Sequence, residues 1–305
     1  MCRMASEVSA LHDGRFEDAA RLATEAEALL SEQRGLSCWP LNVARIYHIA
    51  ALHHEGRIRE LCRLTRAFHD DALDRGDRFA ATMVSSSFSL LLWLCADDLE
   101  GARTSLAEAE KLCPEGVFYV PHVFCLQGRA MVELYAQNGE SAYRHIAGIW
   151  PVLTRSEILR VEALGVMCLW ARASCAIAAA RVSSDPAPLL AVAQRDAALL
   201  RRTHFSMIYT RDWPLMFNAA IASVRGEREA ALAHLDHAMD GFREDGAAFL
   251  SAVARRRKGG LLGGGEGRAL MAEADEWMRS EGIVSPARLA EAYAPGFPDG
   301  TLGDS

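Results

Sequence analysis

The heptapeptide GRFEDAA at residues 14–20 decides the fold, because related turns recur along the chain at a nearly constant spacing. Turn residues at positions 14, 56, 97, 139, 185 and 226 open the segments GRFEDAA, GRIREL, DDLEGA, GESAY, DPAPLL and GEREAAL. The successive spacings are 42, 41, 42, 46 and 41 residues. A period of this length indicates a stack of repeated supersecondary units.

Each turn lies between two segments with the apolar periodicity of a helix. The apolar residues after the first turn recur every three or four positions: Ala19, Leu22, Ala23, Ala26 and Leu29. Glycine suits the end of a helix, where a left-handed residue is common. We therefore expect an all-α chain, a tetratricopeptide-like superhelix (solenoid) of about six to seven helical hairpins. It should span residues 1–296, with a disordered tail over 297–305.

Two stretches, 116–124 and 204–210, have the aromatic and β-branched composition of strands. The repeat places both near the start of a first helix, and Pro121 fits a first helical turn better than a central strand. We expect helices to begin there. Pro151 and Pro214 should mark a kink or a helix boundary.

Composition narrows the classes of function. The chain has 305 residues, half of them apolar, and a formal net charge of −7, which disfavours a nucleic-acid surface. The eight cysteines include no C-x-x-C pair, and the N-terminus lacks the apolar run of a signal peptide. The longest apolar stretches, residues 80–96 and 161–182, are interrupted by polar or charged residues. We expect a soluble cytoplasmic protein without a nucleic-acid or membrane partner.

No catalytic, cofactor-binding or metal-binding residue is predicted. His53-His54-Glu55 lacks the second histidine four positions on that a zinc helix needs, so we expect a solvated helix end. The glycine run at 259–267 lacks the lysine of a phosphate loop, so we expect a flexible hairpin turn.

The basic run near the C-terminal end and the short N-terminal segment carry two further expectations. The basic run at 255–258 should be a solvated helix end, with an anion-binding patch as the alternative. Few residues precede the first turn, too few for a full first helix, so residues 1 to about 12 should fray.

The segment at 149–162 holds the candidate partner-binding residues. Trp150, Arg155 and Arg160, with Trp170 further on, are of the types favoured at binding hot spots. The alternative is that both indoles are core wedges between hairpins, with Arg160 or Arg172 paired to carboxylates.

Five segments resemble the C-terminal helical-repeat region of large bacterial serine/threonine protein kinases with a STAND-type AAA ATPase domain. They are GDRFAAT (76–82), LWLCADDLEGAR (92–103), WPVLTRSEILR (150–160), ARASCAIAAA (171–180) and GEGRALMAEADEWMRSEGI (265–283). Kinase and ATPase motifs are absent here, so no catalytic residue carries over. Naming the chain a kinase would describe only its ancestry: it would be the C-terminal part of a longer ancestor or the product of a split gene.

The resemblance implies a scaffold or sensor in signalling, with a kinase or ATPase signalling protein as a possible partner. The alternative is a stand-alone regulator that binds a peptide or small ligand in its concave groove.

Overall fold

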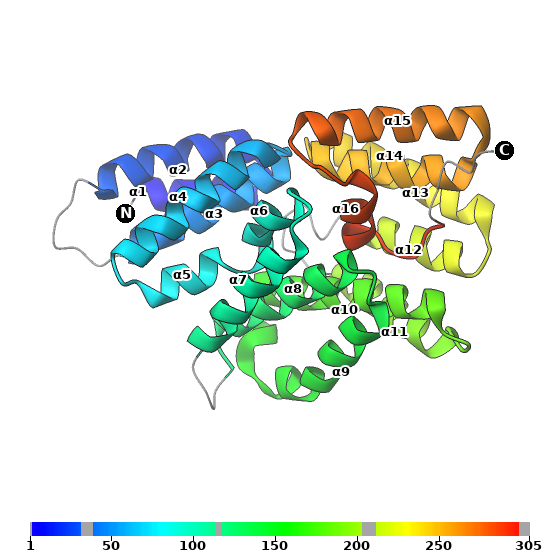
Figure 1. Cartoon of the computed structure of the whole chain (residues 1–305), viewed down its shortest axis with the longest axis horizontal. Coiled ribbons are helices and arrows are strands. Elements are labelled where there is room, and N and C mark those ends of the chain that lie inside the picture. The colour runs from blue at the N-terminus through cyan, green and yellow to red at the C-terminus, as the bar shows by residue number, and fades with distance from the viewer. Residues whose placement is uncertain (1, 32–38, 114–117, 203–211, 299–305) are drawn as a thin grey trace.

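The structure is a computed structural model that describes residues 2–31, 39–113, 118–202 and 212–298 (Figure 1). These residues form α-helices and two short 3₁₀ helices and contain no strand, which confirms the all-α prediction. The N-terminal helices are α1 (Cys2–His12), α2 (Phe16–Ser31), α3 (Trp39–Glu55), α4 (Ile58–Asp74), α5 (Arg78–Val84), η1 (Ser87–Leu90), α6 (Leu91–Leu94) and α7 (Leu99–Leu112). The middle helices are α8 (Val120–Tyr135), α9 (Gly139–Arg155), η2 (Glu157–Arg160), α10 (Glu162–Val182) and α11 (Ala187–Leu200). The C-terminal helices are α12 (Trp213–Val224), α13 (Arg228–Glu244), α14 (Ala248–Leu262), α15 (Gly264–Ser280) and α16 (Pro286–Tyr293).

Neighbouring helices in this part of the chain pack as seven hairpins, and α16 follows the last of them. The pairs are α1 with α2, α3 with α4, α5 and α6 with α7, α8 with α9, α10 with α11, α12 with α13, and α14 with α15. The second helix of each hairpin also contacts the first helix of the next. One large apolar core runs through these contacts, and a small separate cluster holds Ala72, Ala80 and Ala81.

The turns show how the repeat is built. Gly14, Gly56 and Gly226 have left-handed backbones, with φ of 74°, 80° and 77°. Asp97 and Gln137 take the same conformation at the third and fourth turns. Gly139 therefore has a different role from the one expected: it is the first residue of α9, and an added Cβ would lie 2.6 Å from the backbone of Ala178. At this turn glycine is needed for close helix packing.

One strand-like stretch and one of the two prolines match their predictions. Helix α8 begins at Val120 with Pro121 in its first turn, which confirms the predicted helix start. The second stretch, 204–210, lies outside the described residues. Pro214 is in the first turn of α12, whereas Pro151 lies inside α9.

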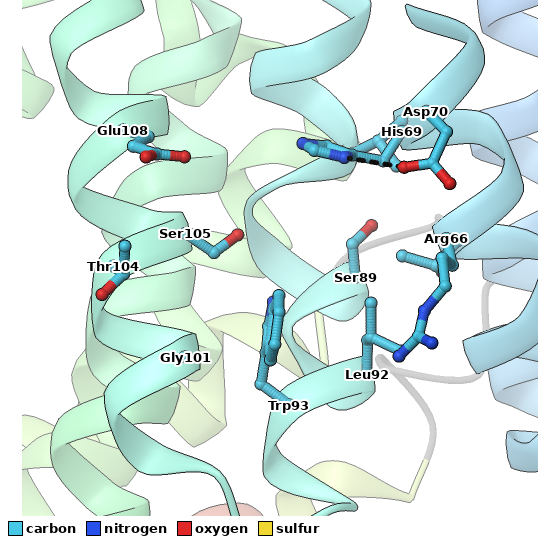
Figure 2. Close-up of a pocket in the computed structure, with 12 residues that line it drawn as sticks. Arg66, His69, Asp70, Ser89, Leu92, Trp93, Gly101, Thr104, Ser105 and Glu108 are labelled. Atoms are coloured by element: carbon cyan, nitrogen blue, oxygen red, sulfur yellow. Dashed lines mark ion pairs between the residues drawn. The ribbon is translucent and has the colours of Figure 1, made fainter. Parts of the chain in front are cut away.

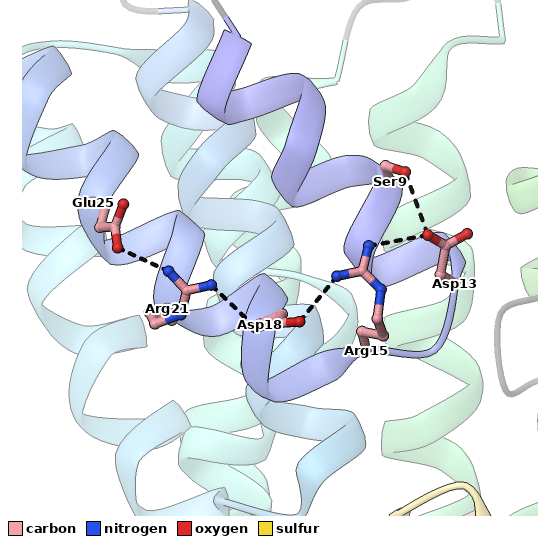
Figure 3. Close-up of polar contacts among 6 residues, drawn as sticks. All are labelled: Ser9, Asp13, Arg15, Asp18, Arg21 and Glu25. Carbon is pink, nitrogen blue, oxygen red and sulfur yellow. Dashed lines mark hydrogen bonds and ion pairs between the residues drawn. The ribbon is translucent and has the colours of Figure 1, made fainter.

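The first hairpin is more complete than its length suggested. Helix α1 has 11 residues and buries Ala10 and Leu11, so a first helix does form. Exposed ion pairs join its turn to α2, in which Arg15 binds Asp13 at 3.1 Å and Asp18 at 2.9 Å (Figure 3). Exposed pairs of this kind contribute little to stability, so the buried apolar contacts hold α1 in place.

The two ends of the chain meet in a contact that we call the seam. Helix α3 packs against α14, and Arg59 of α4 donates a 2.6 Å hydrogen bond to the carbonyl of Ser280. The amide of Val284 donates to the carbonyl of Cys95 at 2.8 Å. Figure 1 shows the N-terminal hairpins beside α14 and α15, with α16 between them and the middle helices. The expected tail is packed at its start, because Phe297 is buried.

Helix α10 alone, among the described helices, is long and apolar enough to cross a membrane. Most of its most apolar window, 72%, is buried inside the protein. Arg172 on this helix pairs with the buried Asp196 of α11, at 2.7 Å from Nε to Oδ2. The apolar character of α10 thus fits its position as a core helix.

The glycine run forms part of a helix crossing. Gly259 lies in α14 and Gly267 in α15, and an added Cβ on either would fall within 2.6 Å of the other's carbonyl oxygen. The expectation of a flexible turn was wrong over most of this run, because the glycines let two helices approach closely. Gly263, with φ of 62°, is the residue between the helices.

Candidate functional site: a cleft beside Trp93

The structure does not bring the four predicted partner-binding residues onto one exposed surface. Trp170 is buried, with its ring 5.6 Å from Trp213 and 6.1 Å from Tyr293. Trp150 is half-buried beneath the guanidinium of Arg172, which lies 3.3 Å from the ring centroid. These contacts are those of core wedges, the alternative considered from the sequence.

Arg155 and Arg160 point to solvent near the end of α9 and in η2. Arg160 pairs with Glu157 at 2.5 Å, and both side chains are largely exposed. This pair provides charge at the surface but no cavity.

The interior between the first helices of the hairpins is occupied by α16. Glu291 of α16 is buried and accepts from Arg257 of α14 at 2.6 Å and from Arg181 of α10 at 3.3 Å. Arg257 also lies over the ring of Phe297. Any ligand at this position would have to replace α16.

The basic run at 255–258 is therefore not a solvated helix end. Each of its four side chains contacts a carboxylate of the same chain. The pairs are Arg255 with Glu273, Arg256 with Asp275, Arg257 with Glu291 and Lys258 with Asp236. Because these charges are already neutralised, an anion-binding patch does not form either.

His53 and His54 are also buried, contrary to the expected solvated helix end. The Nε2 atom of His53 lies 2.8 Å from the hydroxyl of Tyr293, and His54 packs on Phe16. Burial lowers the pKa of His53 well below its ordinary value and lowers the pKa of His54 to about 3. Both imidazoles are neutral at pH 7 and belong to the seam.

An open cleft lies on the outer side of the second and third hairpins (Figure 2). Helix α4 forms one wall, α7 the other, and η1 with α6 the floor. Its volume is about 470 Å³, within the range of pockets that bind small ligands or peptide side chains. We call it the Trp93 cleft.

A break in the first helix of the third hairpin shapes this floor. The serine-rich stretch at 85–89 separates α5 from α6 and contains Ser87, a non-glycine residue with φ of 59°. The Ser87 hydroxyl donates to the side chain of Gln127 on α8 at 2.5 Å, which holds the break. Strained backbone that is fixed by its surroundings is common at functional sites.

Trp93 is fixed in place by the helix beside it. Its ring lies against Gly101 of α7, where an added Cβ would be 2.4 Å from Trp93 Cε3. The indole is only partly buried and lines the cleft. Gly101 therefore gives the cleft a rigid aromatic wall.

Hydroxyl groups line the middle of the cleft. Thr65 is 1% exposed, and its Oγ1 atom has no hydrogen-bond partner among the described residues. Ser89 is buried in the floor, and Ser105 donates to the carbonyl of Ser85 at 3.2 Å. An unpaired buried hydroxyl costs free energy, and a bound polar group would offset that cost.

Charges of opposite sign lie at opposite ends of the cleft. Arg66 is exposed beside Leu92 at the Trp93 end (Figure 2). Glu108 lies at the other end, opposite His69, which is 3.7 Å from Asp70. Charges placed in this way can orient a ligand that carries both signs, and no hydrogen bond joins a lining hydroxyl to His69 among the described residues.

A second recess lies among the turns that follow α1, α3 and α13, with a volume of about 660 Å³. Its two arginines already have partners, because Arg15 binds Asp13 and Asp18 and Arg57 binds Glu55 at 3.0 Å. In the described part of the chain, no group of three or more His, Cys, Asp or Glu side chains could hold a metal ion. The Trp93 cleft is therefore the strongest candidate site.

Sequence reasoning missed this cleft for a definite reason. Its residues come from several helices of two hairpins, and helical periodicity does not reveal which helices leave a gap between them. The serine run at 85–89 was visible only as an interruption of an apolar stretch. It was the one signal that could have led to the cleft.

Comparisons with known proteins add no relative. No protein family, curated protein or solved structure matches this chain.

Proposed function

We propose that this chain is a non-catalytic protein–protein interaction module, built as a tetratricopeptide-like superhelix. Seven successive hairpins, with turns near the positions that the 42-residue period predicts, support this architecture. The observation that carries the function is the Trp93 cleft, a preformed recess with a fixed indole and an arginine beside it. Tryptophan and arginine are the residue types that dominate binding energy at protein interfaces.

The resemblance to repeat regions of bacterial kinases suggests the setting. In this proposal the module acts in the cytoplasm as a scaffold or sensor of a serine/threonine kinase or STAND ATPase signalling system. The partner would be a protein or peptide, such as a kinase or ATPase signalling protein, and it would contact the cleft between α4 and α7.

A second candidate is a stand-alone regulator that binds a peptide or small ligand. The concave groove expected for such a ligand is occupied by α16, whereas the Trp93 cleft is open and has a suitable volume. We therefore place this alternative in the same cleft.

Site-specific photocrosslinking tests the interaction function. The full chain, carrying a benzophenone amino acid in place of Thr104 in the cleft wall, is irradiated in its own cells. A matched chain carries the same group at Glu229, an exposed position of α13. We expect a discrete adduct from position 104, absent from position 229 and lost when Trp93→Ala is added. Identical adducts from both positions, or none from position 104, would refute the proposal.

Mass spectrometry of the adduct then tests the setting. A kinase or ATPase signalling protein would support the proposed system. If the adduct contains a metabolic enzyme instead, the interaction function stands and the signalling role is refuted.

A further inference from the structure

We propose that the Trp93 cleft binds a short peptide segment in which a carboxylate adjoins an aromatic side chain. The carboxylate pairs with Arg66, and the aromatic ring packs on Trp93. This inference rests on the proposed function and specifies the chemistry of the partner at that site.

Arg66 differs from the other arginines of its helix. Arg63 lies 3.8 Å from Glu60, and the Arg59 side chain donates to the carbonyl of Ser280, while its backbone amide donates to Glu281. Arg66 makes no hydrogen bond or ion pair among the described residues, although it borders a cavity. A guanidinium in this setting favours a planar carboxylate, which it can bind through two parallel hydrogen bonds.

The Trp93 ring supplies the second part of the site. Gly101 holds the indole against the cleft wall, so binding would not require the ring to be ordered first. Leu92 extends this apolar surface towards Arg66 (Figure 2). Aromatic pairs are stabilised beyond the burial of area alone, so a phenyl ring fits this end better than an aliphatic chain does.

The hydroxyls favour a peptide over an isolated anion. Thr65 Oγ1 is buried without a partner at the cleft lining, and Ser89 is buried in the floor between Arg66 and His69. A peptide backbone brings N–H and C=O groups that both hydroxyls can bind. A small inorganic anion at Arg66 would leave Trp93 uncovered and Thr65 unpaired.

The far end of the cleft sets the direction of the segment. Glu108 and Asp70 lie there with His69, so a ligand carboxylate at that end meets like charge (Figure 2). The acidic group is therefore directed to Arg66, and the segment runs along the hydroxyls towards Glu108.

Binding of capped dipeptides to the full chain tests this chemistry. The chain contains six tryptophans, so 5-fluorotryptophan labelling gives fluorine resonances, and the Trp93→Phe variant assigns that of Trp93. The probes are acetyl-Glu-Phe-amide, its neutral analogue acetyl-Gln-Phe-amide, and inorganic phosphate. We expect the acidic dipeptide to shift the Trp93 resonance saturably and to bind about tenfold more tightly than the neutral one.

Variants on α4 connect the effect to one side chain. Arg66→Gln should remove the preference for the acidic dipeptide, whereas Arg63→Gln, the same change three residues earlier, should keep it. Arg66→Glu should reverse the preference towards acetyl-Lys-Phe-amide, a gain that misfolding cannot produce.

Three results would overturn the inference: equal binding of the acidic and neutral dipeptides, a phosphate shift equal to that of the acidic dipeptide, or no shift of Trp93. If crosslinked adducts form at position 104 while the dipeptides fail, the ligand chemistry is wrong and the interaction function stands. If the dipeptides bind as expected while no adduct forms, the chemistry of the cleft stands and the proposed function fails.

Discussion

Gly56 and Gly226 occupy equivalent turns in two hairpins, yet their surroundings differ completely. Both begin a Gly-Arg or Gly-Glu turn, and their φ angles, 80° and 77°, are nearly the same. An added Cβ at Gly226 would meet nothing within 4 Å. At Gly56 it would lie 2.8 Å from the amide nitrogen of Phe249 and 3.1 Å from the ring of Trp277.

The difference separates backbone conformations that neighbouring residues set from contacts that only the complete fold creates. The left-handed turn follows from the residues beside it, so the same conformation recurs wherever the repeat places a turn. The contact of Gly56 with α14 joins residues almost two hundred positions apart, and it exists only because the ends of the chain meet at the seam. Open turns and seam contacts should therefore respond differently to the same substitution.

The largest contrast is expected from valine at the two glycines. Gly226→Val should cost about 1–2 kcal/mol, because a β-branched residue is strained at positive φ. Gly56→Val should cost roughly 3–5 kcal/mol, because the same strain is added to a clash with the backbone of Phe249. Denaturant melts of both variants measure the difference. Equal losses would mean that α3 and α14 do not pack as closely as the structure shows.

Glu291→Ala tests the ionic contact of α16 with α14 and α10. Removing one partner of a buried pair costs about 3–5 kcal/mol, and we expect the lower half of that range because Arg257 also contacts Phe297. The exposed pair of Glu157 and Arg160 is the control, and Glu157→Ala should cost less than about 0.5 kcal/mol. A loss for Glu291→Ala as small as that of the control would contradict the position of α16.

The seam should weaken in acid because of its two buried histidines. Their pKa values are lowered by burial, that of His54 to about 3, so the folded state disfavours protonation. Their contribution to stability is present above the unfolded value near 6.5 and is lost as pH falls through the window below it, by up to about 1.4 kcal/mol per unit for each histidine. Melts of the parent and of His54→Gln at pH 7, 6 and 5 measure this. The gap between the two proteins should narrow towards pH 5, and a constant gap would exclude His54 as a source of acid sensitivity.

Glu7 on α1 gives the opposite pH dependence. Its carboxylate is buried without a hydrogen-bond partner among the described residues, and burial, with Glu27 nearby, raises its pKa to about 8. A raised carboxyl pKa favours the folded state at low pH, and this contribution is lost as pH rises from about 4.5 to 8. Glu7→Gln should therefore stabilise the chain by about 1–3 kcal/mol at pH 8 and by much less at pH 5. The same gain at both pH values would mean that the carboxyl does not titrate in this window.

The sequence was sufficient for features that depend on neighbouring residues. The turns at Gly14, Gly56, Asp97 and Gly226 and the helix start at Pro121 follow from local backbone preferences and apolar spacing. The same sequence patterns did not predict contacts between hairpins that lie far apart along the chain. His53, His54 and the basic run looked solvated because their partners, such as Tyr293 and Glu291, come from a helix that packs inside the assembled hairpins.

The candidate site shows the same limit. Trp150 and Trp170 were singled out as anchors because of residue type, and both are held by contacts within the core. Trp93 has the same residue type but lines a cleft, because it packs against Gly101 beside the break at Ser87 and stays partly exposed. Residue type predicts what a side chain can bind, whereas packing decides whether it is accessible.

The smallest contrast concerns two glycines inside helices, where positive φ is not needed. Gly148 is exposed in the middle of α9, and an added Cβ would meet nothing within 4 Å. Gly148→Ala should stabilise the chain by about 0.5–1 kcal/mol, because alanine loses less backbone entropy on folding. Gly165 in α10 has the same helical setting, but its added Cβ would lie 3.1 Å from the carbonyl oxygen of Leu159.

That close contact should offset the gain, so Gly165→Ala should change stability by less than about 0.5 kcal/mol. Denaturant melts of the two alanine variants, measured beside each other, separate helix propensity from packing. Equal stabilisation at both sites would mean that η2 shifts to make room for the new methyl group. A loss of more than about 1 kcal/mol at Gly165 would mean that the junction of η2 and α10 is as rigid as the seam at Gly56.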